Sequence, residues 1–142
     1  MVEGVADVKA GCQDRVMSTW TSDELDRIGG AEELRVSSRR RDGSFSKPIT
    51  IWVARVGDDL FVRSAYGPDN PWYVNARARG RGRISAGGVE REVDFADASG
   101  TDPETIDDEY HAKYDPISSP RIVATVVGEP VHPLTLRLDA RD

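Results

Sequence analysis

Residues 60–79 read LFVRSAYGPDNPWYVNARAR, and this stretch carries the clearest sequence of structural signals in the chain. Branched and aromatic residues over Leu60–Ala65 predict a strand. Gly and Pro in Tyr66–Asn70 predict a loop. Asn70 followed by Pro71 is the arrangement favoured at a helix start, and Gly80 ends that helix at about Arg79. The stretch is therefore predicted to form a strand, a loop and a helix in succession.

The same stretch gathers groups that suit an anionic ring compound. An anion near the helix start would meet unpaired backbone N–H groups and the positive end of the helix dipole. Arg63 supplies a cation and Ser64 a hydroxyl donor, while Tyr66 and Trp72 offer flat faces for a ring system. The alternative is that Trp72 packs the helix on the sheet and Arg63 is solvated. These residues alone leave the two interpretations evenly balanced.

Strands are predicted on both sides of this stretch. Alternating or branched residues place them at 34–38, 49–56, 83–86, 89–95 and 134–138. Turn residues join them, and the pair Gly87-Gly88 is the clearest hairpin. The connections after 34–38 and after 49–56 are too short for a crossover. The first three strands are therefore expected to be antiparallel neighbours.

Further helices are predicted from their first residues. Thr21 and Glu24 form a capping box before a short helix of about 22–28. Asp102 before a proline begins a helix over 104–114. The apolar stripe of that helix comprises Ile106, Tyr110 and Tyr114. Residues 120–127 fit either a helix or a strand.

These elements define the expected fold class. The 142 residues suffice for one domain with one core. Six strands, three or four short helices and no sustained βαβ alternation predict a mainly β protein of α+β type, an antiparallel barrel or curled sheet with helices at its ends. Residues 1–17 lack periodicity and are predicted to be a disordered N-terminal extension. Residues 18–142 form the predicted domain.

Charge is concentrated in the middle of an acidic chain. Residues 35–91 hold 12 basic and 5 acidic residues, whereas the whole chain has a net charge of −6. Arginine dominates the cations and suits planar contacts with phosphate or carboxylate. Either a local anion site lies in this segment, or its arginines pair with the acidic ends across the surface. The overall negative charge argues against nucleic acid as a partner.

Composition also excludes several classes of protein and site. Cys12 is the only cysteine and the chain has two histidines, so no metal site is expected. No apolar run is long enough to cross a membrane, and no secretory signal begins the chain, which predicts a cytoplasmic protein without membrane contact. Catalytic motifs are absent, and no catalytic residue is assigned. The carboxylates of 107–109 are interpreted as a solvated helix face, with His111 pairing with Asp107 or Asp108.

The sequence resembles the FMN-binding split-barrel superfamily, near the branch of deazaflavin-dependent nitroreductases. The resemblance rests on a strand ending in Ser64, the loop glycine Gly67, the helix start at 70–75 (NPWYVN) and the strand and turn at 83–88 (RISAGG). Residues 20–138 also resemble a small bacterial family of unknown function in that superfamily. Its recognisable parts are the start at 20–25 (WTSDEL) and the segment 110–114 (YHAKY).

The resemblance implies a six-stranded split barrel with a flavin-type phosphate at the end of the third strand and the following helix. The residues that it implies around FMN or a deazaflavin are Thr50, Trp52, Arg63, Ser64, Tyr66, Trp72 and Asn75. Thr50 and Trp52 would border the ring. It also implies a homodimer with the ligand at the interface. Ala65 departs from the nitroreductase branch, which has a lysine there, so the phosphate contact would come from Arg63, or from Arg77 or Arg79.

Three functions follow as hypotheses. The first is an oxidoreductase that transfers a hydride between a bound flavin or deazaflavin and a small molecule, with the ring supplying the chemistry. The second is a non-catalytic binder of another anionic or aromatic ligand, such as haem. The third is a dimeric interaction module without a cofactor.

Overall fold

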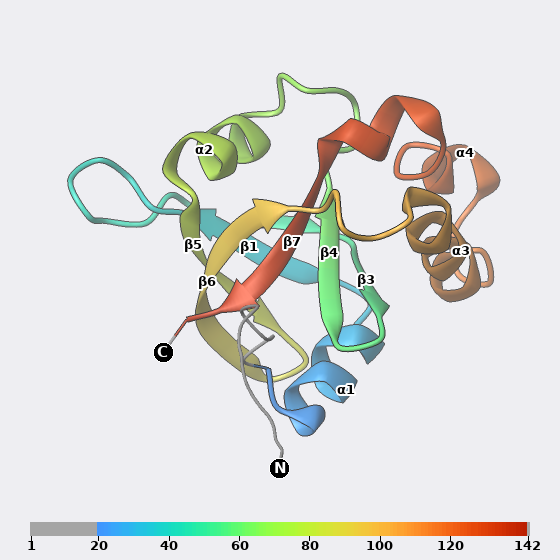
Figure 1. Ribbon diagram of the computed structural model, residues 1–142, viewed down its shortest axis with the longest axis horizontal. Coiled ribbons are helices and arrows are strands. Elements are labelled where there is room, and N and C mark those ends of the chain that lie inside the picture. Colours follow the sequence, from blue (N-terminus) through green and yellow to red (C-terminus); the bar gives the residue numbers. More distant parts are fainter. Residues whose placement is uncertain (1–19, 142) are drawn as a thin grey trace, which may run out of the picture.

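The strand expected at 49–56 is divided at Trp52 into β2 (Ile49–Ile51) and β3 (Val53–Val56). β2 pairs with β1 (Leu34–Ser38), and β3 pairs with β4 (Asp59–Arg63). In this computed structural model, which describes residues 20–141, the sheet order is β2-β1-β5-β6-β7-β4-β3. Because the two outermost strands are parts of one continuous segment, the sheet curls into a nearly closed barrel (Figure 1).

This division corrects the expected number of strands from six to seven, while the mainly β antiparallel barrel is confirmed. β5 (Arg81–Ala86) and β6 (Val89–Asp97) form the hairpin predicted at Gly87-Gly88, and both glycines have positive φ. β7 (Thr135–Ala140) lies between β6 and β4. All the pairings are antiparallel.

Short helices cover the ends and one outer side of the barrel (Figure 1). They are α1 (Ser22–Gly30), α2 (Pro71–Arg79), α3 (Pro103–Tyr114), α4 (Pro120–Val123) and the 3-10 helix η2 (Glu129–Leu134). The capping box of α1 is present, with the Thr21 hydroxyl accepting from the Glu24 N–H at 3.1 Å. Of the two alternatives for 120–127, the helix forms over its first four residues.

Apolar side chains form two separate buried clusters. The larger fills the barrel with inward residues such as Val36, Leu60 and Ile84. The smaller lies between α3, α4 and the outer side of β3 and β4, where Phe61 meets Tyr110. The predicted stripe of α3 therefore packs on the outside of the barrel, not in its interior.

Three further predictions concern the N-terminal extension, membrane-spanning segments and metal sites. The extension predicted at 1–17 lies outside the described residues. Within residues 20–141, no helix has the length and apolar character needed to cross a bilayer. The same residues contain no group of three His, Cys, Asp or Glu side chains that could hold a metal ion.

Candidate functional site

The break between β2 and β3 opens a cleft on one side of the barrel. The cleft has a volume of about 230 Å³ and lies between this break, the loop after β4, the start of α2 and the end of α4. Its lining residues are Ile49, Thr50, Ile51, Trp52, Arg63, Ala65, Tyr66, Asn70, Trp72, Ile122, Thr125 and Val126. Five of the seven residues expected around a cofactor are thus brought together, and Ser64 and Asn75 are not among the lining residues.

Trp52 forms one wall of the cleft and is held rigidly. Its indole stacks on the Tyr114 ring, with 3.9 Å between centroids and 6° between planes. Tyr114 in turn is fixed by its hydroxyl, which donates to the carbonyl of Glu32 at 2.7 Å. Burial raises the pKa of the Tyr114 hydroxyl to about 12, so this stack stays uncharged near neutral pH. The cleft therefore has a flat aromatic border whose position does not depend on a ligand.

The loop between β4 and α2 contains an aromatic residue, Tyr66, whose backbone conformation is strained. Tyr66 is 82% exposed and lines the cleft, and its φ of 65° lies in the left-handed region that L residues rarely adopt. The Ser64 hydroxyl donates to the Gly67 carbonyl at 2.6 Å, and this hydrogen bond stabilises the loop conformation. Ser64 itself is fully buried, so its hydroxyl serves the loop and is not presented to the cleft.

The start of α2 is held by the core and not by the expected side-chain cap. Asn70 occupies the N-cap position without a capping hydrogen bond, and its amide donates instead to the Ala65 carbonyl at 3.4 Å. Trp72 is only 5% exposed and belongs to the barrel core, although it also lines the cleft. Its indole N–H is buried without an acceptor among the described residues. Asn75 is exposed on α2, away from the cleft lining.

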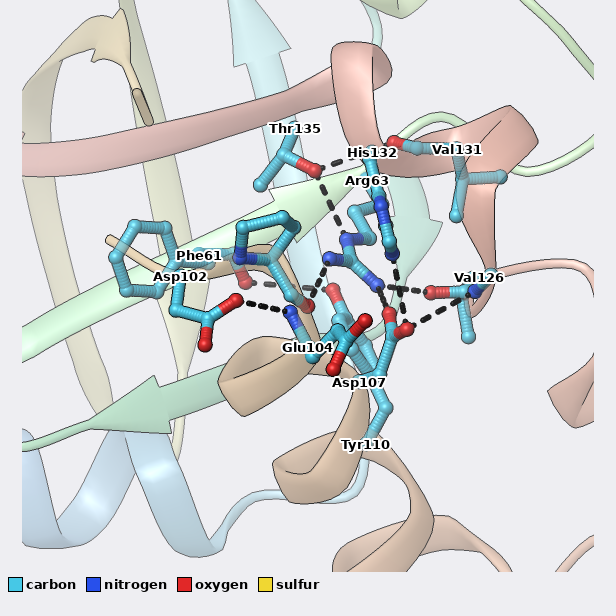
Figure 2. Close-up of polar contacts among 12 residues, drawn as sticks. Phe61, Arg63, Asp102, Glu104, Asp107, Tyr110, Val126, Val131, His132 and Thr135 are labelled. Carbon is cyan, nitrogen blue, oxygen red and sulfur yellow. Dashed lines mark hydrogen bonds and ion pairs between the residues drawn. The ribbon is translucent and has the colours of Figure 1, made fainter. Parts of the chain in front are cut away.

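Arg63 is buried and neutralised, in contrast to the free cation that the sequence suggested. It is 1% exposed, and its guanidinium pairs with the Asp107 carboxylate (Figure 2). Its remaining N–H groups donate to Thr135 Oγ1 at 2.9 Å and to the carbonyls of Val126 and Pro103 at 2.7 and 3.0 Å. Arg63 thus ties β4 to β7, α3 and the segment after α4, and most of its hydrogen-bonding capacity is used inside the chain.

Asp107 was expected on a solvated helix face, and this interpretation was wrong. Besides Arg63, its carboxylate accepts from the Gly128 N–H at 3.2 Å and lies 2.9 Å from His132 Nε2 (Figure 2). Burial pushes the pKa of the Asp107 carboxyl upward, but the hydrogen bonds from His132 and Arg63 outweigh it, and the pKa lies below its ordinary value. The Arg63, Asp107 and His132 side chains therefore form one hydrogen-bonded ionic cluster behind the cleft.

The other predicted helix pair is also different. The His111 ring lies 3.0 Å from the carboxylate of Asp115, the C-cap of α3, and not beside Asp107 or Asp108. Both side chains are exposed, and neither lines the cleft. They form a surface pair of the kind that contributes little to stability.

Lys113 is a titratable group behind the aromatic wall whose pKa is changed by burial. Its ammonium donates to the Val53 carbonyl at 2.9 Å and lies 5.1 Å from the centre of the Tyr114 ring. Burial lowers the pKa of Lys113 to about 8. Lys113 therefore supports the rear of the Trp52–Tyr114 stack, on the side of α3.

Comparison with known proteins places the chain in a family and its fold in a group of solved structures. The family described as "Uncharacterized protein conserved in bacteria (DUF2255)" matches residues 24–138. No curated protein matches the chain.

The solved structures share the fold at low sequence identity. An F420 reductase is 15% identical with a TM-score of 0.52, over 83% of this chain and 93% of the reductase. A conserved hypothetical protein from Mycobacterium tuberculosis is 14% identical with a TM-score of 0.55, over 90% and 85% of the two chains. A FAD-binding protein from Mesorhizobium loti is 13% identical with a TM-score of 0.50, over 87% and 91%. These likenesses confirm the split-barrel architecture, and the chain belongs to the bacterial family DUF2255.

Proposed function

We propose that this protein binds a flavin-type ring cofactor, FMN or a deazaflavin, in the cleft at the β2–β3 break, and that it is an oxidoreductase acting on a small molecule. When bound, such a cofactor supplies hydride transfer. The chain's own residues would hold the ring, orient it and exclude water from it. The observation that carries the proposal is an open, mainly apolar cleft bordered by the rigid indole of Trp52 and the exposed ring of Tyr66.

The rim of the cleft supports an apolar occupant. Three of the large hydrophobic residues that are exposed on the described surface line this one cleft: Ile49, Tyr66 and Ile122, at 44%, 82% and 44% exposure. Exposed apolar residues that gather around a hollow mark a binding surface. Thr50 and Thr125 add polar groups to the lining, although the Thr125 hydroxyl donates to the Ile122 carbonyl at 2.6 Å and is left only as an acceptor.

The fold supports the same class of ligand. The names of two of the similar structures are F420 reductase and FAD-binding protein, and both have TM-scores of at least 0.50. Among the described residues, the lining of the cleft holds no His, Cys or Met side chain, and Tyr66 is its one side chain of a type that ligates haem iron, which makes haem ligation a poorer match. A flavin-type ring is therefore favoured over haem.

The phosphate of such a cofactor would be held differently from the sequence expectation. Arg63 is already paired with Asp107, and Ala65 stands where the nitroreductase branch has a lysine. At the start of α2, Pro71 has no N–H and the N–H groups of Tyr73 and Val74 donate to the Asn70 carbonyl, so the Trp72 N–H is the backbone donor that this helix offers beside the cleft. The proposal therefore places the phosphate at α2 and leaves Arg63 as a structural support.

A second copy of the chain would complete the site. The cleft of one chain is smaller than the ~300 Å³ at which pockets for drug-sized ligands begin, and its rim is apolar. We therefore propose a homodimer in which the partner covers the cleft. Light scattering of the purified protein should give twice the mass of one chain, and a monomer at all concentrations would contradict this part of the proposal.

The experiment for cofactor binding is a calorimetric titration of the purified protein with FMN and, separately, with the deazaflavin F420. Ile122→Asp places a charge on the cleft rim, and Ile117→Asp places the same charge on an exposed isoleucine outside the cleft. Micromolar or tighter binding that Ile122→Asp weakens at least tenfold and Ile117→Asp leaves unchanged would support the proposal. Failure of both compounds to bind at concentrations far above micromolar would end it.

A further inference from the structure

A second hollow lies on the outer face of β1 and β5, among arginines that have no acidic partner. Within residues 20–141, no ion pair joins a carboxylate to any arginine of this group: Arg35, Arg39, Arg40, Arg41, Arg77, Arg79, Arg81 and Arg83. One of the two sequence interpretations held that these arginines pair with the acidic ends of the chain. Three arginines of the basic segment do form such pairs, Arg55 with Asp26, Arg63 with Asp107 and Arg91 with Glu24, whereas the eight named above form none with a described carboxylate.

Strand register brings two of these arginines around a serine. In the β1–β5 ladder, Ser37 is opposite Arg83, and Arg35 is opposite Ser85. The intervening residues Val36 and Ile84 are buried in the barrel core. Because side chains alternate between the faces of a strand, Arg35, Ser37 and Arg83 share the outer face.

The loop between β1 and β2 covers this face and makes it concave. The hollow has a volume of about 310 Å³, and Phe45 from the loop lies over it, with the Arg83 guanidinium 4.5 Å from the centre of the ring. Ser46 secures the loop, since its hydroxyl accepts from the Ser38 N–H at 2.9 Å. Arg35, Ser37 and Pro48 also line the hollow. It shares none of its lining residues with the apolar cleft.

Ser37 is the feature that points to a ligand. It is only 6% exposed, yet its hydroxyl makes no hydrogen bond with any described residue, and the residue lines the hollow. Neighbouring Ser38, by contrast, donates its hydroxyl to the Trp72 carbonyl at 3.3 Å. Unlike the enclosed Trp72 indole N–H, the Ser37 oxygen keeps some surface open, so it can reach a ligand in the hollow. The floor of the hollow thus presents an unused donor between two unpaired guanidinium groups.

We propose that this hollow binds a small phosphate monoester, with the phosphate held by Arg35, Arg83 and the Ser37 hydroxyl. Two guanidinium groups match the charge of a phosphate dianion and can each make paired hydrogen bonds to its oxygens. Phe45 and Pro48 offer an apolar wall for the organic part. Glu90 lies at the rim opposite Ser85, and Glu92 lies opposite Arg83 in the β5–β6 ladder; their negative charges favour one phosphate group over a longer polyanion.

The test is a calorimetric titration of the whole chain with phenyl phosphate, alongside inorganic phosphate, sulfate and benzoate. Phenyl phosphate should bind most tightly, because it alone combines the phosphate with a ring for the apolar wall. Arg35→Gln and Arg83→Gln should each weaken its binding about tenfold or more, and Ser37→Ala about threefold. Arg121→Gln removes an exposed arginine from α4, outside the hollow, and should leave the affinity unchanged.

Two results would overturn the proposal. One is the absence of binding at phenyl phosphate concentrations of about 10 mM, because a site with this set of donors should bind the compound at much lower concentrations. The other is an equal loss in Arg83→Gln and Arg121→Gln, or equal binding of sulfate and phenyl phosphate, since either would indicate attraction to net charge alone. Neither result bears on flavin binding, because the Ile122 and Ile117 variants test that separately at the other site.

Discussion

Arg63 and Arg83 both lie on strands beside a hollow, but their surroundings are opposite. Arg63 is 1% exposed and bonded to Asp107, Thr135 and two carbonyls, whereas Arg83 is exposed, lies over the Phe45 ring and forms no ion pair with a described residue, although Glu92 is opposite it in the β5–β6 ladder. In the sequence, Arg63 was the more attractive candidate for an anion because it precedes a serine and a helix start. The comparison shows that an arginine next to a ligand-like motif can be part of the framework, while one in a plain alternating strand keeps its charge available.

The largest effect should come from removing the buried arginine. Arg63→Gln leaves Asp107 without its ionic partner in a mostly buried position, and breaking such a pair should lower the free energy of unfolding by about 3–5 kcal/mol. Arg83→Gln should change it by less than about 1 kcal/mol, because it loses only an exposed ring contact. Urea unfolding followed by circular dichroism measures both. Equal small changes would show that Arg63 is not a structural residue.

The carboxylate of the same cluster should make stability depend on acidic pH. The pKa of Asp107 is lower in the folded protein than its ordinary value, so the folded state favours the charged form. This contribution is present above about pH 4, the ordinary carboxyl range, and is lost as pH falls further through the folded pKa. Unfolding midpoints measured from pH 5 to pH 3 should therefore fall more in the parent protein than in Asp107→Asn. The neighbouring Asp108→Asn, on the exposed side of α3, should keep the parent's pH dependence.

Behind the aromatic wall of the cleft, the amine of Lys113 should give a second rise in stability with pH, in the alkaline range. Its pKa of about 8 is below the ordinary 10.5, so the folded state releases the proton first. The free energy of unfolding should be lower below pH 8, where Lys113 is protonated in both the folded and the unfolded state. It should rise as pH increases from 8 towards 10.5. Since Lys113 is partly solvated, the gain should be on the order of 1 kcal/mol. Lys113→Met should abolish this rise in urea unfolding measured at pH 7 and pH 10, and a rise that persists in the variant would assign it to another group.

The smallest expected effect separates stability from binding at Tyr66. Tyr66→Gly relieves a left-handed backbone and should raise the free energy of unfolding by up to about 1 kcal/mol, while it removes a ring from the cleft and weakens FMN binding severalfold. Tyr66→Ala removes the same ring but keeps the strain, so it should bind as weakly without the gain in stability. If Tyr66→Gly binds FMN as tightly as the parent, the ring of Tyr66 has no role in the site.

Local features of the fold were predictable from the sequence. The Gly87-Gly88 hairpin, the capping box at Thr21 and the helix after Asn70 each depend on residues that are close together in the chain, and all three formed. The division at Trp52 was not predictable in this way. β2 and β3 are separated only because they pair with different strands, and that choice depends on contacts distant in sequence.

The ionic cluster behind the cleft was missed for the same reason. Asp107 is 44 residues from Arg63 and 25 from His132, so no local spacing connects them. One signal was available: Asp107 directly follows the buried Ile106 and lies one turn before Tyr110, at the edge of the apolar stripe of α3. A carboxylate at the edge of such a stripe is half-buried and needs a partner. The next two acidic residues lie on the exposed face, as expected.

The most direct test of the account is a crystal structure of the protein with FMN bound. The account predicts the ring in the cleft at the β2–β3 break, against Trp52 and Tyr66, with Arg63 still paired with Asp107. A ring bound at the outer face of β1 and β5, or a phosphate in direct contact with Arg63 after its separation from Asp107, would contradict it.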